Sequence, residues 1–255
     1  MKVSDQLREL DGQVALVTGS AKNIGRAINL ALADAGAKVV INALTSRAEA
    51  QSLAAEINDA GGEAMAHIAD IRDPSAVQEM LAVAVEHFGG LNILVNNASL
   101  RQLLPLDEMT LEAWRAIFAV TVEGAMLCSV AALPHLRAAG NGTVINISGI
   151  ASQLGVKDRL HAATANAALE GMVRSLAHEL APYGVTANAI SPGMIDTVRG
   201  ASAGKVPASI AAVGGVLGRK GKPEEIAAIV RALCGPAGRY VTGQTINANG
   251  GMYFN

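Results

Sequence analysis

The sequence predicts an α/β protein with three layers, in which a seven-stranded parallel sheet carries helices on both faces. Seven short β-branched or apolar runs are spread along the 255 residues, and each of the first six is followed by a turn and a segment of helical periodicity. Strands that alternate with helices in this way form parallel sheets covered on both faces. No internal repeat, low-complexity segment or linker interrupts the pattern, so we expect one domain over residues 1–255.

The expected strands are continuous apolar runs, as in a sheet that is buried on both sides. In chain order they are Val14–Thr18, Lys38–Asn42, Ala64–Ala69, Leu91–Asn96, Thr143–Ile147, Thr186–Ile190 and Thr245–Ala248. Capping residues and prolines mark three helix starts. Asp73-Pro74 precedes Ser75–Phe88, Thr110 precedes Leu111–Ala139, and Pro223 precedes Glu224–Leu233. Met194–Gly221 is rich in Gly, Ala and Ser and is expected to form a mobile lid.

Composition excludes several classes of protein. Charged residues make up 16% of the chain, hydrophobic residues 51%, and the net charge is −2 without a basic block, which argues against nucleic-acid binding. Cys128 and Cys234 have no redox or metal spacing, no two of the five histidines have metal-ligand spacing, and we expect no metal. The start MKVSDQLRELDG is charged where a signal peptide is apolar, and polar residues break the apolar runs, so we expect no membrane segment and a cytoplasmic protein.

Two helices are apolar over more of their circumference than one sheet contact requires. They are Leu111–Ala139 and His161–Ala181, the second being rich in alanine. A helix that is apolar nearly all round needs a second partner. The two alternatives are extra core and a subunit interface, and we favour a homo-oligomer, a dimer or tetramer, built through these helices.

A glycine turn follows the first strand and opens a helix, as in sites that hold a pyrophosphate at a helix N-terminus. Its candidate binding residues are Gly19, Ser20, Lys22, Asn23, Ile24 and Gly25. Asn23 replaces the usual middle glycine, and asparagine tolerates the left-handed backbone better than most residues do. Polar or turn residues also follow later strands, at the sheet edge where α/β folds bind ligands. These segments are Asn96-Asn97-Ala98, Asn146-Ile147-Ser148 and Ser191-Pro192-Gly193.

Together these motifs resemble the short-chain dehydrogenase/reductase family, from about Leu10 to Gly251. Further matches are Pro223-Glu224-Glu225-Ile226, Val241-Thr242-Gly243-Gln244 and the Asn249-Gly250-Gly251 near the end. The resemblance implies a Rossmann fold that binds NAD(P). It also implies that Asp70 and Ile71 border the adenine, Asn97 and Ala98 the ribose, and Pro192 and Gly193 the nicotinamide.

The second strand ends without the carboxylate that would bind the ribose diol of NAD(H). Instead, Lys22 in the glycine turn is accompanied by Thr45, Ser46 and Arg47, which can surround a 2′-phosphate with donors and positive charge. We therefore expect NADP(H) in preference to NAD(H).

The family transfers a proton through a Ser, a Tyr, a Lys four residues later, and an Asn on the preceding long helix. Alignment of Asn146-Ile147-Ser148 and Ala167-Ala168-Leu169 places Gly149, Ala162 and Asn166 at the first three positions, and Thr121 at the fourth. We call these four the relay positions. Loss of a positioned general acid costs about a hundredfold to ten-thousandfold in rate, so ordinary carbonyl reduction should be weak or absent.

Candidates for a replacement catalytic residue are His161, Ser152 and Asn166, of which Asn166 can also bind the nicotinamide ribose. His161 lies one position before Ala162, and a rotation of about 100° around the helix separates them. Lys157, Asp158 and Arg159 are interpreted as a solvated loop. Three functions stay open: redox chemistry on a small carbonyl, alcohol or enone through an unusual proton donor; a nucleotide-binding pseudoenzyme or regulatory subunit; and a non-redox enzyme.

Overall fold

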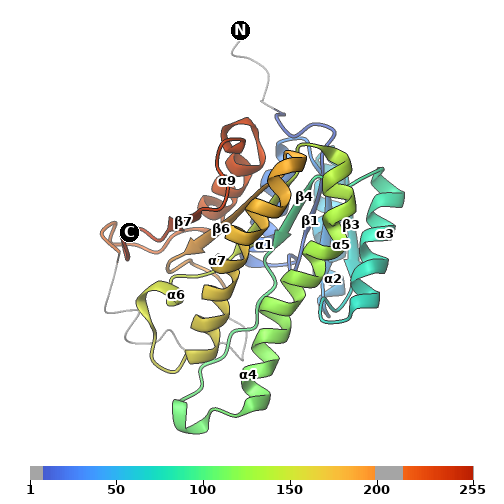
Figure 1. Cartoon of the computed structure of the whole chain (residues 1–255). Coiled ribbons are helices and arrows are strands. Elements are labelled where there is room, and N and C mark those ends of the chain that lie inside the picture. The colour runs from blue at the N-terminus through green and yellow to red at the C-terminus, as the bar shows by residue number, and fades with distance from the viewer. Residues whose placement is uncertain (1–7, 199–214, 255) are drawn as a thin grey trace.

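The computed structural model describes residues 8–198 and 215–254, which form a seven-stranded parallel sheet between two layers of helices (Figure 1). The strand order is β3-β2-β1-β4-β5-β6-β7. The strands are β1 (Val14–Val17), β2 (Lys38–Ala43), β3 (Ala64–Ile68), β4 (Ile93–Asn96), β5 (Thr143–Ile147), β6 (Thr186–Pro192) and β7 (Thr245–Ala248). The prediction of a seven-stranded Rossmann sheet is confirmed, with strand ends that differ by one or two residues.

The central strands β1, β4, β5 and β6 are buried along their whole length, because helices cover both faces of the sheet. One face packs against α1 (Asn23–Asp34), α2 (Arg47–Asp59) and α9 (Pro223–Cys234). The other packs against α3 (Pro74–Phe88), α5 (Gly124–Ala139) and α7 (Leu160–Leu180). Shorter helical segments are η1 (Leu106–Glu108), α4 (Leu111–Phe118), η2 (Ala119–Glu123), α6 (Ala151–Leu154), η3 (Ala181–Tyr183) and η5 (Pro236–Gly238).

Helices of the structure begin at the three places that capping residues and prolines mark in the sequence. Asp73 caps α3 by accepting a hydrogen bond from Ser75 N–H at 2.8 Å, and Thr110 caps α4 by accepting one from Ala113 N–H at 3.2 Å. The segment Leu111–Ala139 was predicted to be one continuous α-helix. In the structure, five residues within it, Ala119–Glu123, form a π-helical turn between α4 and α5. Such turns are frequent at functional sites, and this one carries Thr121.

By length and composition alone, Leu111–Ala139 would suffice to cross a membrane, since it has 29 residues and its most apolar window has a mean hydropathy of 2.0. In the fold, its α5 part packs on α3 and β4, and its α4 part contacts α7. Figure 1 shows the long helix lying along the sheet beside α7. Its apolar surface therefore contributes to the core of an α/β domain.

Most of the predicted lid, Met194–Gly221, lies outside the described residues. Its two ends are described, and they are joined by a parallel bridge between Ile195 and Gly221. Asp196 N–H donates to Gly221 O at 2.8 Å, and Gly221 N–H donates to Met194 O at 2.9 Å. The lid prediction itself stays untested.

Candidate functional site

A cavity of about 530 Å³ lies at the carboxyl ends of the parallel strands. At one end it is bordered by the glycine turn and by Leu44, and at the other by residues that follow β5 and β6 and by the start of α7. Ten of the expected binding residues line it: Gly19, Lys22, Asn23, Ile24, Gly25, Asn97, Ala98, Asn166, Pro192 and Gly193. The topology thus brings together motifs that lie up to 174 residues apart, from Gly19 to Gly193.

The glycine turn has the backbone geometry that its sequence predicts. Gly19 has a φ of +57° and Asn23 a φ of +53°, so Asn23 does adopt the left-handed conformation of the glycine it replaces. The end of β4 packs directly against the turn. Asn97 Nδ2 donates to the carbonyl oxygens of Thr18 and Gly19, both at 2.9 Å, while Thr18 Oγ1 accepts from the N–H groups of Asn97 and Ala98.

The four relay positions line the same cavity, at the end remote from the glycine turn. A β-carbon added to Gly149 would lie 3.1 Å from Asn166 Nδ2, so positions 149 and 166 face each other. Thr121 is 2% exposed, and its Oγ1 has no hydrogen-bond partner within the described part of the chain. The structure thus brings the four residues selected by the sequence spacing to one cavity.

Comparison with known proteins identifies the family to which this architecture belongs. The sequence family described as enoyl-(acyl carrier protein) reductase matches residues 19–253. The 3-oxoacyl-(acyl-carrier-protein) reductase of Synechocystis sp. is 37% identical over 246 residues, which cover 95% of this chain and 98% of that relative. A short chain dehydrogenase from Burkholderia cenocepacia, solved in complex with NADP, is 35% identical with a TM-score of 0.88, covering 96% and 99% of the two chains. The chain belongs to the short-chain dehydrogenase/reductase family. It is thereby an oxidoreductase by family.

A second solved relative is a blue fluorescent protein from a metagenomic library in complex with NADPH. It is 34% identical, with a TM-score of 0.89 and coverage of 96% of this chain and 100% of that one. The dinucleotide site of the family fits the residues present here. A β-carbon on Gly25 would lie 2.6 Å from Ser20 Cα, and one on Gly193 would lie 2.7 Å from Asn249 Cα, so side chains at these two positions would disrupt the walls of the cavity.

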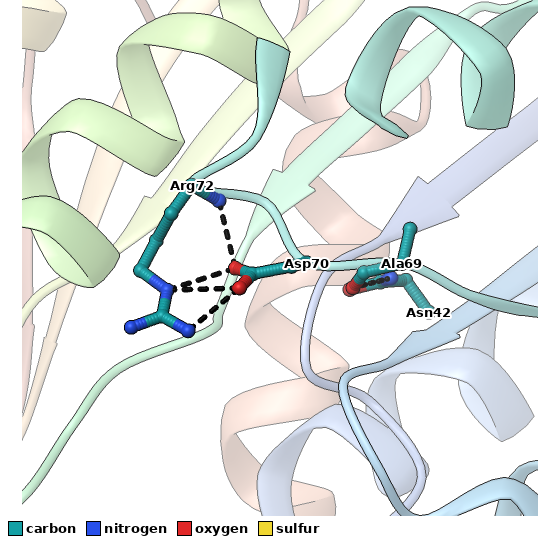
Figure 2. A network of polar contacts seen from close by, with 4 residues as sticks. All are labelled: Asn42, Ala69, Asp70 and Arg72. Carbon is teal, nitrogen blue, oxygen red and sulfur yellow. Dashed lines mark hydrogen bonds and ion pairs between the residues drawn. The ribbon is translucent and has the colours of Figure 1, made fainter. Parts of the chain in front are cut away.

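Asn42, near the end of β2, fixes the glycine turn of this family member, and Figure 2 shows its hydrogen bond with Ala69. Its Oδ1 accepts from Gly19 N–H at 3.1 Å, and its Nδ2 donates to Ala69 O at 3.1 Å and to His67 O at 3.4 Å. Its own carbonyl accepts from Ser20 N–H at 2.7 Å. One buried side chain therefore connects β2, β3 and the turn. This role was not predicted, although a polar residue at the end of an otherwise apolar run is a signal for it.

We expect Asn42→Ala to lower the free energy of unfolding by about 2–4 kcal/mol, because it leaves buried backbone groups without partners. It should also weaken pyridine-nucleotide binding several-fold. Asn58→Ala is the matched control, since Asn58 hydrogen-bonds both Ala64 N–H and Ala64 O away from the cavity. Urea unfolding and nucleotide titration of both variants check this; equal losses of nucleotide affinity would contradict the assigned role.

The expected 2′-phosphate site is only partly assembled. Lys22 lines the cavity, but its Nζ lies 2.6 Å from Glu49 Oε1, and the hydrogen bond from Lys22 lowers the pKa of the Glu49 carboxyl. Thr45, Ser46 and Arg47 do not contribute to the lining. Thr45 and Arg47 are exposed beside the start of α2.

The residues expected at the adenine also lie outside the cavity lining. Asp70 is bound by the Arg72 guanidinium, as Figure 2 shows. Arg72 Nη2 lies 2.6 Å from Asp70 Oδ2. These hydrogen bonds hold the pKa of the Asp70 carboxyl below its ordinary value. Ile71 packs beneath Gly124, where an added β-carbon would lie 2.6 Å from Ile71 Cδ1. Ser20, another expected binding residue, also lies outside the cavity lining: its Oγ donates to Val17 O at 2.7 Å.

The two remaining catalytic candidates are turned away from the cavity. His161 is fully buried and does not line it, because one helix position rotates it away from Ala162. Desolvation, and then the charge of Arg159, lower the pKa of His161. Ser152 Oγ lies 2.8 Å from Gly149 O and 2.6 Å from Glu170 Oε1, two acceptors for its single proton, and Ser152 too is absent from the lining. The geometry gives direct proton donation by either residue no support.

Proposed function

We propose that this protein is an NADP(H)-dependent oxidoreductase acting on a small carbonyl, alcohol or enone compound. One observation carries the proposal: a single cavity runs from the glycine turn to the relay positions, so a dinucleotide and a substrate can meet in it. The NADP and NADPH complexes of two relatives support the choice of coenzyme.

The chain's own residues supply binding and orientation. The backbone of the glycine turn offers N–H groups to the pyrophosphate, Asn97 and Ala98 border the ribose, and Pro192 and Gly193 form the wall beside the nicotinamide. Asn166 is placed to hydrogen-bond a ribose hydroxyl, without the charge that a lysine would add. The bound nicotinamide supplies or accepts the hydride.

The proton follows another route than a tyrosine hydroxyl. We propose that water enters beside Ala162 and is hydrogen-bonded by Thr121 Oγ1 and the Asn166 amide, which line the same cavity. Water is a weak acid, so the arrangement favours enone reduction. There, hydride adds to the β-carbon, and water donates a proton to the α-carbon of the resulting enolate. The hydroxide left behind is neutralised by a proton from the solvent.

The test is an NADPH titration by calorimetry, followed by hydride-transfer assays on paired saturated ketones and enones. The proposal expects micromolar NADPH binding and oxidation of NADPH by at least some enones, with ketones slower by about a hundredfold or more. Failure to bind NADPH would overturn it, and so would ketone reduction as fast as enone reduction.

A second candidate function is a nucleotide-binding pseudoenzyme or regulatory subunit. Gly149 and Ala162 favour this alternative, because neither residue has an ionisable group that could transfer a proton. NADPH binding without turnover of any ketone or enone would select this alternative.

The coenzyme preference has its own test in Glu49→Gln. Removing this carboxylate leaves Lys22 available to a 2′-phosphate, so we expect the NADPH dissociation constant to fall about twofold to fivefold while that of NADH stays constant. The gain should fade as salt is added. Glu56→Gln is the matched control, because Glu56 pairs with Arg26 away from the cavity lining. Equal improvement for NADH and NADPH would contradict the assignment of Lys22.

We also propose a cytoplasmic homo-oligomer, a dimer or tetramer, that uses α5 and α7. Met126 and Val130 of α5 are 43% and 61% exposed, and an apolar hollow of about 180 Å³ lies between the two helices. Val130→Glu should dissociate the assembly in light scattering; a monomeric parent protein would overturn the proposal.

A further inference from the structure

The charged groups that line the cavity all have the same sign. Within the described residues, its charged lining side chains are Lys22, Arg101, Arg159 and Lys220, and no carboxylate is among them. Lys22 belongs to the glycine-turn end and pairs with Glu49, while Lys220 pairs with Asp196 at 3.2 Å. Side chains of one sign in a hollow with apolar walls concentrate their field on whatever enters it.

The two arginines lie on loops that border the relay positions. Arg101 is in the loop after β4, and Arg159 precedes α7, three residues before Ala162. The backbone joins these loops, because Leu104 N–H donates to Asp158 O at 2.9 Å. Arg159 is half-buried, which corrects its interpretation as part of a solvated loop. A guanidinium carries a permanent positive charge and five N–H donors.

Two further features favour an anion at this place. Arg159 occupies the N-cap position of the 21-residue helix α7, whose first turn has no acidic residue, so the helix dipole adds positive potential where Ala162 lines the cavity. In the same cavity, the buried Thr121 Oγ1 has no hydrogen-bond partner in the described structure. A buried hydroxyl is normally satisfied, so this one points to a polar ligand or water.

We propose that the cavity binds a substrate that carries a carboxylate, held by Arg159 and Arg101, with the substrate's other polar group directed towards Thr121. Arginine binds carboxylates through two parallel hydrogen bonds, which fixes orientation as well as charge. The substrate class is therefore a small oxo acid or unsaturated acid. The reaction on it rests on the proposed oxidoreductase function, whereas the carboxylate site does not.

The test compares matched acids and neutral esters by calorimetry, with and without NADPH. The probes are pyruvate, levulinate and crotonate, each beside its methyl ester. We expect at least one acid to bind about tenfold or more tightly than its ester, because a hydrogen bond to a charged group is worth that factor. Arg159→Gln should remove this preference, with a much larger loss of affinity for the acid than for the ester, and Arg159→Lys should keep part of it.

Lys157→Gln is the matched control. Lys157 is exposed and lies outside the cavity lining, two residues before Arg159. Its replacement by glutamine removes the same charge as Arg159→Gln does. It should retain the preference for acids. Acids and esters of equal affinity would overturn the inference, and so would equal losses in Lys157→Gln and Arg159→Gln. Failure of NADPH to bind while the acid preference persists would overturn the proposed function and leave this inference standing.

Discussion

The triple replacement Gly149→Ser, Ala162→Tyr and Asn166→Lys is expected to raise NADPH-dependent ketone reduction by about a hundredfold to ten-thousandfold. That is the range a positioned general acid contributes. The three positions line one cavity at the carboxyl edge of the sheet, so the new hydroxyls and ammonium group would project into the same space. The ammonium group would lower the pKa of the new tyrosine, which improves it as a proton donor near neutral pH.

The three changes depend on one another sterically. A β-carbon at position 149 lies 3.1 Å from Asn166 Nδ2, so Gly149→Ser alone must displace the amide, whereas Asn166→Lys removes the branched group that crowds it. We therefore expect the single serine variant to be inactive and the triple variant to be active. The measurement is kcat/KM for a ketone panel at saturating NADPH.

Ala163→Tyr is the matched control for the tyrosine. Position 163 follows 162 on α7 but does not line the cavity, so a tyrosine there should leave ketone reduction unchanged. If the triple variant folds and binds NADPH yet gains less than tenfold, the relay positions do not have the family's geometry. The assigned register would then be wrong.

The fold was predictable because its signals are local and repeated. Apolar runs such as Val14–Val17 and Thr143–Ile147 are buried along their whole length, and such runs separated by helices leave few arrangements other than a parallel sheet. The π-helical turn at Ala119–Glu123 was not predicted. A π-turn adds about one residue to a helical turn, but Leu111–Ala139 is apolar over so much of its circumference that the resulting shift of the apolar stripe is not visible in the sequence.

The site was predictable where it depends on backbone geometry, and less so where side chains choose partners. The left-handed Asn23 follows from the chemistry of asparagine in a turn. The Lys22–Glu49 and Asp70–Arg72 pairs do not follow, because each depends on the direction of a flexible side chain. Arg159 was misread for a related reason: a charged triplet in a loop is typical of solvent exposure, and the contact between Leu104 and Asp158 that brings its loop to the cavity is non-local.

Gly25→Ala is expected to abolish measurable nucleotide binding, with a loss of about a hundredfold or more, and to lower the free energy of unfolding by about 1–3 kcal/mol. The added β-carbon would lie 2.6 Å from Ser20 Cα and 2.7 Å from Asn97 Nδ2. The first contact is with the backbone of the turn itself, so the turn must open. The second is with the amide that hydrogen-bonds the carbonyl oxygens of Thr18 and Gly19.

The two expected losses have different physical origins, which makes the variant informative. Opening of the turn moves N–H groups that would face a pyrophosphate, whereas displacement of Asn97 breaks hydrogen bonds within the protein. Gly90→Ala is the matched control, because a β-carbon there meets nothing within 4 Å. Thermal unfolding and NADPH titration of both variants separate the effects. A folded Gly25→Ala protein that still binds NADPH with parental affinity would show that the glycine turn does not hold the coenzyme, and the nucleotide site would have to lie elsewhere.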